Sequence, residues 1–342
     1  MLAYQHAVSQ HKSTEEIKEI HAFSNESKLY LENKYGDIFV SGWDKNNIEI
    51  VVNIEAESKT EEKAEKLLKR VQTSIVVSDK EVKLTSTIAK KEGGFLGRLD
   101  PFKNEKTKIN YTIYMPKNAT IEAYNTYGNI IISDWNGMLK SEIEHGEIQL
   151  SSTIRNANLT VKHGKLNAVR IEESHITVKD ATVTIHNGNN LKIDADGSEM
   201  TLNNMKNLAL YSNKDNIDIL KVDGITGNIK HSKTFLKNLG GKTKLDLHYG
   251  ELRILKHITA SPNIDINQKE SEVYINISET NIAFKAKLEQ GVLRIPKTMD
   301  NIESEIIDRK DKIRHISATY GAENGGTITC TGFKGVIILK EL

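Results

Sequence analysis

Short runs of alternating apolar and polar residues are arranged around glycines along most of the chain. Around Gly164 the apolar positions are five and three residues before the glycine and two and four residues after it. The same spacing surrounds Gly250 and Gly291, and part of it recurs around Gly36. A period of two on each side predicts a β-strand on each side. The step across the glycine is five, an odd number, so both strands keep their apolar face inward only if the chain bends there.

The bend recurs at nearly regular distances. Gly128, Gly146 and Gly164 are 18 residues apart, and the later distances of 24, 62 and 41 residues suit one, three and two turns of about 20 residues. Glycine can supply the positive φ that such a bend needs. The pattern therefore predicts a β-solenoid with about 18–21 residues per coil and roughly eight to ten coils. Antiparallel hairpins are the alternative, although only Asn187-Gly188 is a typical two-residue turn. The recurring dipeptides are Tyr35-Gly36, Tyr127-Gly128, His145-Gly146, His163-Gly164, Asn187-Gly188, Tyr249-Gly250, Gln290-Gly291 and Tyr320-Gly321.

A longer repeat relates two segments 92 residues apart. The run LYLENKYGDIFVSGWD from Leu29 matches IEAYNTYGNIIISDWN from Ile121, and the two tryptophans, Trp43 and Trp135, coincide. These segments are predicted to be neighbouring or equivalent strands. Between them one helix is predicted from about Lys59 to Val71, opened by a capping box at Ser58 and Glu61.

The chain is expected to divide into three parts. These are an N-terminal segment (1–20), an α+β cap with the first coil (21–118), and the β-solenoid (119–342). Strands at 74–77, 82–88 and 108–115 complete the cap, which would cover the exposed end of the first coil. Residues 90–106 are predicted to form a mobile loop, whose apolar residues could touch a membrane or partner or fold over the first coil.

Composition agrees with a β-rich chain. Isoleucine outnumbers leucine 41 to 27, and β-branched residues favour strands. The formal net charge of +1 gives no electrostatic reason to expect nucleic acid as a partner. No membrane span is expected, because no apolar run approaches about 18 residues. The single cysteine excludes a disulfide framework within the chain and any zinc site made of several cysteines.

The first ten residues leave the compartment open. Ala7-Val8-Ser9 before Gln10 matches the small-x-small pattern of a signal cleavage site. One interpretation is an export signal truncated by a late start, which predicts the periplasm, the outer-membrane surface or the extracellular space. The other is a frayed terminus of a cytoplasmic protein.

The order of these motifs resembles a known family. The paired Asn-x-Tyr-Gly-x-Ile segments, the tryptophan seven residues after each glycine and the run IYMPKNATIEAYNTYGNI from Ile113 are similar to the DUF4097 putative adhesin family of Bacteroidetes, and more distantly to DUF2807 head domains. The resemblance covers residues from about Ile20 onward. It implies a right-handed β-helix in an exported or envelope protein, and it brings no catalytic residues with it.

Candidate binding residues lie at the bends. Tyr35, Tyr127, His145, His163 and Tyr249 could form a strip for glycan or peptide contact, together with Tyr320, Trp43 and Trp135. The alternative is that each ring plugs a corner or contacts the cap.

Two further groups of residues have structural interpretations. His145 and His163 would stack about 5 Å apart and could hold a metal with Glu144 or Glu147, but solvated corner residues are the favoured interpretation. Asn33 and Asn125 are expected to bond the backbone of the bend, and Cys330 to be buried. No metal or cofactor is expected.

The function expected is a non-catalytic envelope or surface scaffold that presents an extended face to an unknown protein or glycan. The positions after the bend carry Asp37, Asn129, Glu147, Lys165, Asn189, Glu251 and Val292, a mixture typical of a solvated surface rather than of an active site. Two alternatives stay open. One is a carbohydrate-active β-helix enzyme, which requires converging carboxylates. The other is a self-assembling structural solenoid, and a homo-oligomer is compatible with all three.

Overall fold

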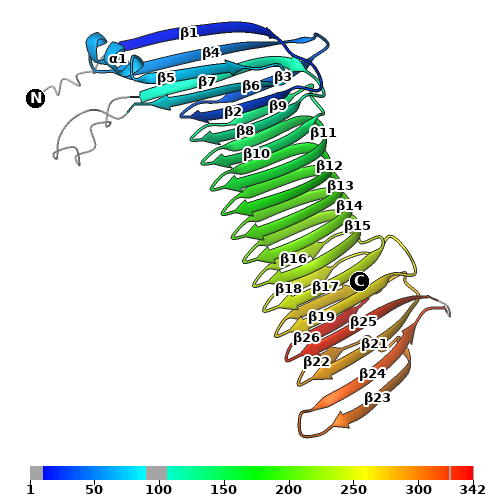
Figure 1. The fold of residues 1–342 in the computed structure, drawn as a ribbon. Coiled ribbons are helices and arrows are strands. Elements are labelled where there is room, and N and C mark those ends of the chain that lie inside the picture. The colour runs from blue at the N-terminus through cyan, green and yellow to red at the C-terminus, as the bar shows by residue number, and fades with distance from the viewer. Residues whose placement is uncertain (1–10, 90–105, 323–324, 342) are drawn as a thin grey trace, which may run out of the picture. The chain divides into compact units, whose positions relative to one another are not determined.

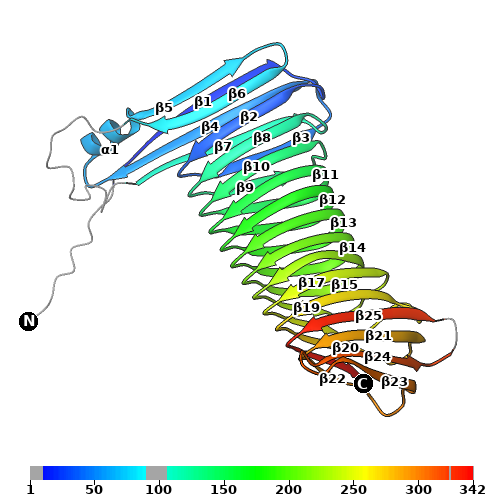
Figure 2. The same ribbon diagram turned by 60° about the horizontal axis from the view of Figure 1, so that its bottom comes forward.

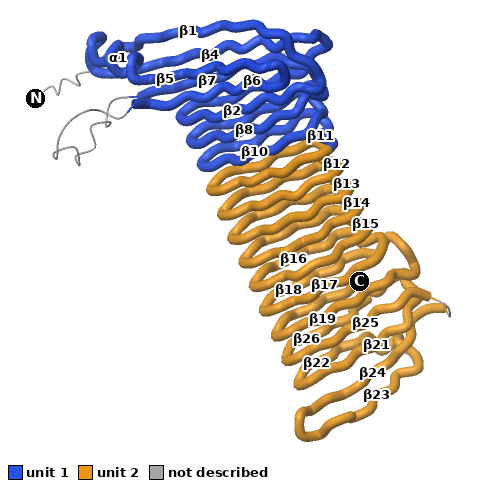
Figure 3. Tube along the Cα trace, viewed as in Figure 1, with its two compact units in different colours: residues 1–155 blue, residues 156–342 orange. Residues whose placement is uncertain are grey.

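The computed structural model describes residues 11–89, 106–322 and 325–341, and β-strands make up most of them (Figure 1). These residues form 26 strands and one helix, so the expectation of an all-β fold is confirmed. The helix has eight residues, and the described part of the chain contains no helix long and apolar enough to cross a membrane. Two units can be distinguished, residues 1–155 and residues 156–342 (Figure 3). The predictions for residues 1–10 and for the loop at 90–105 lie outside the described residues.

Unit 1 contains ten whole strands, the helix and the start of β11. In chain order its elements are β1 (His11–Ala22), β2 (Lys28–Lys34), β3 (Ile38–Trp43), β4 (Asn47–Ser58), α1 (Glu61–Leu68), β5 (Val71–Val77), β6 (Glu81–Ile88), β7 (Lys106–Pro116), β8 (Thr120–Thr126), β9 (Ile130–Ser133), β10 (Met138–Glu144) and β11 (Glu147–Lys162).

In unit 1 the pair β2–β3 lies between two other strand pairs. Leu29 of β2 is opposite Val82 of β6 on one side and Ile121 of β8 on the other, and every contact is parallel. β3 lies between β7 and β9 in the same way. The offset of Leu29 and Ile121 is the 92 residues of the long repeat, so the prediction that these segments are neighbours is confirmed.

Antiparallel strands extend unit 1 beyond β6 and β7. β4 pairs with β7, β1 pairs with β4, and β5 pairs with β6. The helix α1 joins β4 to β5, packs against β4 and β1, and buries Ala64 and Leu67. The predicted capping box at Ser58 was wrong. Ser58 ends β4 and is buried, and the hydroxyl of Thr60 accepts the bond from the Lys63 N–H instead.

Unit 2 contains the remaining strands. They are β12 (Lys165–Lys179), β13 (Thr182–Asp196), β14 (Glu199–Asn213), β15 (Asn216–Lys230), β16 (Lys233–Leu236), β17 (Lys242–His248), β18 (Glu251–Ile254), β19 (Asn263–Lys269), β20 (Glu272–Asn276), β21 (Ile282–Glu289), β22 (Val292–Arg294), β23 (Asp300–Asp308), β24 (Ile313–Tyr320), β25 (Gly326–Phe333) and β26 (Val336–Lys340).

Strands β12 to β15 stack in parallel at a constant offset. Lys165 is opposite Thr182, and the same step of 17 residues continues through β14 and β15 (Figure 2). This step is shorter than the expected coil of 18–21 residues. The placement of a bend at Asn187-Gly188 was also wrong. Gly188 lies inside β13, opposite Ile171 and Met205, and the bend before β13 is formed by Asp180 and Ala181.

The C-terminal strands are inserted between strands that precede them in the chain. β25 pairs in parallel with β19 on one side and with β21 on the other. β26 likewise pairs with both β20 and β22. β24 then pairs antiparallel with β21, and β23 with β24. The last strands of the chain therefore have partners on both edges, as β2 and β3 have in unit 1.

The core consists of the aliphatic residues that alternate inward around each bend. Leu166, Leu247 and Leu252 are at most 1 % exposed, as the parity of the sequence predicted. Burying each such side chain contributes roughly 1.5 to 3 kcal/mol to folding. Cys330 is fully buried as expected, and burial raises the pKa of its thiol to about 12.

The glycines of the bends have a different role from the one predicted. At the bends Tyr35-Gly36, Tyr127-Gly128 and His145-Gly146 the positive φ belongs to the residue before the glycine. The glycine is needed for space, because a Cβ on Gly128 would lie 1.9 Å from the Gly36 carbonyl oxygen. A neighbouring backbone is thus too close for any side chain.

In unit 2 small polar residues replace several of these glycines. Ser198, Asp215 and Ser232 follow one another on successive strands and are buried. The Asp215 carboxylate accepts bonds from the Ser198 N–H at 2.7 Å and from the Asn213 N–H at 2.9 Å. The Ser232 hydroxyl accepts a bond from the Asp215 N–H at 2.9 Å. These side chains hold the bend backbones of adjacent strands together.

Candidate functional site

The predicted site residues of unit 1 share one backbone conformation. Tyr35, Tyr127 and His145 have φ of 66°, 59° and 56°, the left-handed region that asparagine and glycine adopt most easily. This conformation turns each side chain outward at the bend. Tyr35 is 39 % exposed and Tyr127 is 49 % exposed.

These three side chains form a stack. The rings of Tyr35 and Tyr127 lie 5.4 Å apart, and those of Tyr127 and His145 lie 4.9 Å apart, with interplanar angles of 6° and 5°. The ammonium of Lys34 lies over the ring of Tyr35 at 4.8 Å. Stacked faces cover each other, so the stack presents ring edges, two hydroxyl groups and an imidazole to solvent.

The bends of unit 2 carry a more varied set of side chains. His163 and Tyr249 occupy the left-handed position there, as predicted from the dipeptides. His231 stacks on Tyr249 with ring centroids 5.1 Å apart. The successive positions are His163, Asp180, Gly197, Lys214, His231, Tyr249 and Glu270. We call these residues, with Tyr35, Tyr127 and His145 of unit 1, the corner residues.

The other predicted aromatic residues separate into different environments. Trp135 is 1 % exposed and donates a bond from its indole N–H to the Ala119 carbonyl at 3.0 Å, so it belongs to the core. Trp43 is half-buried, donates to the Asn47 carbonyl and stacks on Tyr114. Tyr320 is half-buried, and a hydrogen bond to Glu341 raises its pKa. The structure does not bring these three residues into one strip.

The buried asparagines act as predicted. The amide of Asn33 donates to the Gly36 and Ile109 carbonyl oxygens, at 3.2 and 2.8 Å. The amide of Asn125 donates to the Gly36 carbonyl at 2.8 Å. Both side chains hold the bend backbone.

The histidines considered as metal ligands have acidic neighbours. His145 Nε2 lies 3.8 Å from a Glu144 oxygen, and His163 Nδ1 lies 3.5 Å from an Asp180 oxygen. Over residues 11–89, 106–322 and 325–341, no group of three or more His, Cys, Asp or Glu side chains is placed to hold a metal ion.

Carboxylates with a shifted pKa lie at separate places. Lys140 and Lys28 hydrogen-bond Glu122 and lower its pKa to about 2. Burial raises the pKa of Asp215, and the helical neighbour Lys66 lowers that of Glu62. After the first bends, the Asp37 carboxylate accepts a bond from the Asn129 N–H at 2.9 Å. Each of these groups is bonded to a structural partner.

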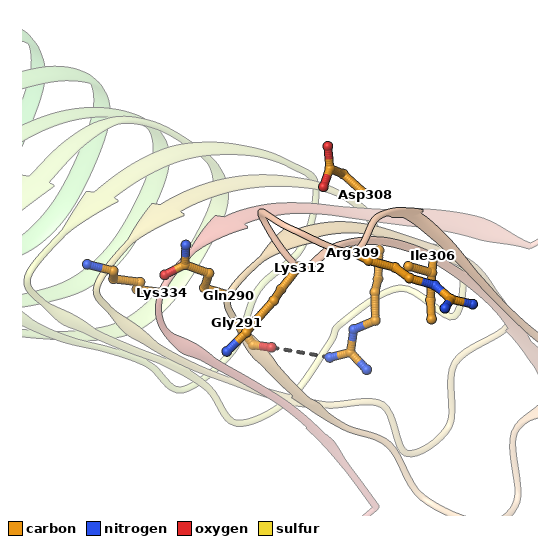
Figure 4. Close-up of a pocket in the computed structure, with 8 residues that line it drawn as sticks. Gln290, Gly291, Ile306, Asp308, Arg309, Lys312 and Lys334 are labelled. Atoms are coloured by element: carbon orange, nitrogen blue, oxygen red, sulfur yellow. Dashed lines mark hydrogen bonds between the residues drawn. The ribbon is translucent and has the colours of Figure 1, made fainter.

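A pocket of about 540 Å³ near the end of unit 2 is lined by basic side chains (Figure 4). It lies where three chain segments meet: the bend at Gln290-Gly291, the turn between β23 and β24, and the bend at Lys334. Its four basic side chains are Arg309, Lys312, Arg314 and Lys334. We call this the basic pocket.

Sequence reasoning did not identify the basic pocket. The only signal was the group of basic residues between Arg309 and Arg314. Nothing in the sequence indicated that Lys334 would come beside Gln290, because that contact depends on the insertion of β25 and β26 next to β21 and β22.

The geometry defines an all-β protein in which parallel strand pairs repeat at short sequence offsets. No family model matches the chain, and no curated protein matches it. Several solved structures resemble it, among them a putative adhesin from Parabacteroides distasonis, with 15 % identity over 77 % of this chain and 97 % of that chain and a TM-score of 0.42.

Two further structures extend this comparison. A putative cell adhesion protein from Clostridium sporogenes has 13 % identity over 96 % of this chain and 100 % of that one, with a TM-score of 0.19. A putative lipid binding protein from Parabacteroides distasonis has 17 % identity over 75 % of this chain and 96 % of that one, with a TM-score of 0.26. Similarity at this level assigns neither a partner nor an activity to the chain.

Proposed function

We propose that the chain is a non-catalytic binding scaffold, a right-handed β-helix (119–342) with an N-terminal α+β cap (21–118), whose corner residues contact a glycan or protein partner. The parallel pairs with offsets of 17 residues support the helical winding, and parallel crossovers in proteins are nearly always right-handed. An exported or surface location belongs to the same proposal.

The observation that carries the proposal is the identity of the corner residues. A side chain with a Cβ costs about 1 to 2 kcal/mol in the left-handed region. Gly197 shows that the bend itself accepts glycine. Tyr35, Tyr127, Tyr249 and several charged residues nevertheless occupy it, with exposed functional groups. A row of strained, exposed and chemically rich side chains is typical of a contact surface.

A non-catalytic role is supported by the carboxylates. Glycoside hydrolysis requires two carboxyl groups on either side of one bond, with pKa values that differ. The described carboxylates with shifted pKa values are bonded to lysines or to the backbone at three separate places. The basic pocket contains one acid, Asp308.

Replacing Tyr35 and Tyr127 by asparagine tests the proposal. Asparagine tolerates the left-handed conformation, so relief of strain should offset the lost stacking of about 0.5 to 1.5 kcal/mol per pair. We expect the free energy of unfolding to change by less than about 1 kcal/mol. Binding on an array of neutral and acidic polysaccharides and surface proteins should weaken at least about tenfold.

Tyr211→Asn is the matched control, because Tyr211 is equally exposed, at 45 %, but lies within β14 and away from the bends. Its array binding should equal that of the unmodified chain. Binding that survives in the double variant, or an unmodified chain that binds no component of the array, would contradict the proposal.

A further inference from the structure

We propose that the basic pocket binds the oxyanion of an acidic sugar, carried as a sulfate ester, a phosphate ester or a carboxylate. This inference concerns a site apart from the rings of unit 1, and it deepens the proposed binding function by naming a ligand class.

The charge of the pocket is the first argument. Arg309, Lys312, Arg314 and Lys334 contribute four positive charges, and Asp308 contributes the one negative charge among its lining residues. The Asp308 carboxylate accepts bonds from the Lys310 and Asp311 N–H groups, at 2.7 and 3.0 Å. In Figure 4 it lies on the far side of the turn from Lys312 and Gly291. Asp308 therefore shapes the turn and does not neutralise the pocket.

The basic groups are available to a ligand. Across the part of the chain that the structure describes, none of the four forms an ion pair with a carboxylate. Arg314 donates one bond to the Gly291 carbonyl at 3.3 Å, which orients its guanidinium and leaves its other donors unused. Positive groups held close together without counter-charge favour an anion, because each gains charge-assisted hydrogen bonds when the anion binds.

The backbone around the pocket is held by hydrogen bonds. The Gln290 N–H donates to the Lys312 carbonyl at 3.3 Å, and the Lys334 N–H donates to the Glu289 carbonyl at 2.9 Å. Gln290, Lys312 and Lys334 all have φ near 50°, so the three bends lie side by side in one conformation. The positions of the basic residues are thus fixed before a ligand arrives, which reduces the entropy lost on binding.

Size and chemistry indicate a sugar rather than a bare ion. A volume of about 540 Å³ falls within the usual range for small-molecule sites and exceeds what one sulfate would fill. The Gln290 side chain can donate to or accept from hydroxyl groups, and the half-exposed Ile306 provides an apolar wall. Hydroxyl groups and an anion on one small ring fit this combination.

Isothermal titration calorimetry of the full chain tests the inference. The probes are a sulfated disaccharide, a galacturonate disaccharide and a hexose phosphate, with inorganic sulfate and a neutral disaccharide for comparison. We expect at least one acidic sugar to bind at one site, about tenfold or more tighter than inorganic sulfate, and the neutral sugar not to bind. The tightest of the three identifies the anionic group. Added salt should weaken binding.

Arg309→Gln and Arg314→Gln, singly and combined, remove charge from the pocket. Each single variant should weaken binding, and the double variant should weaken it about tenfold or more. Lys310→Gln is the control, because Lys310 lies on the same turn but does not line the pocket. Circular dichroism checks that each variant is folded.

Three outcomes would overturn the inference: no acidic sugar binds, inorganic sulfate binds as tightly as the best sugar, or the double arginine variant binds like the Lys310→Gln control. The Tyr35 and Tyr127 variants lie in the other unit and should bind the acidic sugar normally. Failure of the basic pocket and failure of the corner residues are therefore distinguishable.

Discussion

Gly128→Ala should lower the free energy of unfolding by about 3 kcal/mol. A Cβ at this position would lie 1.9 Å from the carbonyl oxygen of Gly36, which belongs to the backbone of an adjacent strand pair. Neither atom can rotate away, so β2–β3 and β8–β9 would have to separate and lengthen their hydrogen bonds. Urea denaturation followed by tryptophan fluorescence measures the change, because Trp43 and Trp135 both lie in unit 1.

Two other bend glycines provide graded controls. A Cβ on Gly250 would lie 2.8 Å from the Ser232 oxygen, and one on Gly291 would lie 3.5 Å from the Gly335 oxygen. Alanine should cost about 1 kcal/mol at Gly250 and almost nothing at Gly291, as far-ultraviolet circular dichroism can record. If all three substitutions cost the same, close backbone approach is not the reason for glycine at Gly128.

Asp215→Ala is the second substitution with a large expected effect. It removes the acceptor of the buried Ser198 and Asn213 N–H groups, and an unsatisfied buried donor costs about 1 to 3 kcal/mol. We expect a net loss of about 2 to 3 kcal/mol in the free energy of unfolding, because removing the buried charge offsets part of the cost. Urea denaturation followed by circular dichroism measures it.

Asp215→Ser is the matched variant. The serines before and after it in the column, Ser198 and Ser232, each accept a neighbouring N–H and donate to a carbonyl two residues earlier. Serine at position 215 should repeat this pattern and cost less than about 1 kcal/mol. A serine variant as unstable as the alanine variant would contradict the proposed role of the column.

The pKa of Asp215 gives this pair a pH dependence. Burial raises the pKa in the folded state above its usual value, so the folded chain holds the proton to a higher pH than the unfolded chain does. The stability of the unmodified chain relative to Asp215→Ser should be greatest below the unfolded pKa. It should fall as pH rises through the folded pKa, in a series from about pH 3 to pH 7.

The alternation of apolar residues was enough to predict the strands and the core. The inward parity of Leu166, Leu247 and Leu252 was predictable because a one-residue slip would expose every aliphatic residue of the strand. The helix was predictable in place but not in its cap, because Ser58 and Thr60 both suit an N-cap and only the end of β4 decides between them.

The bends were harder to read. The dipeptide Asn187-Gly188 has the composition of a turn but lies inside β13, whereas Asp180 and Ala181 form a bend without glycine. Glycine is required only where neighbouring backbones come closest, as at Gly36 and Gly128, and that distance is a property of the stacked strands.

The stack of Tyr35, Tyr127 and His145 was predictable from their shared place before the glycine, whereas the basic pocket was not. The pocket joins residues 290–291, 306–314 and 334, and the chain order gives no sign that β25 and β26 lie beside β21 and β22.

Binding without turnover is the central claim, and the most direct measurement is the chain length of a polysaccharide that the protein binds. An acidic polysaccharide selected on the array is incubated with the protein, and its size distribution is followed by size-exclusion chromatography. We predict that the polysaccharide stays bound and keeps its length. Progressive shortening that is absent from a heat-denatured control would contradict the account and indicate a carbohydrate-active enzyme.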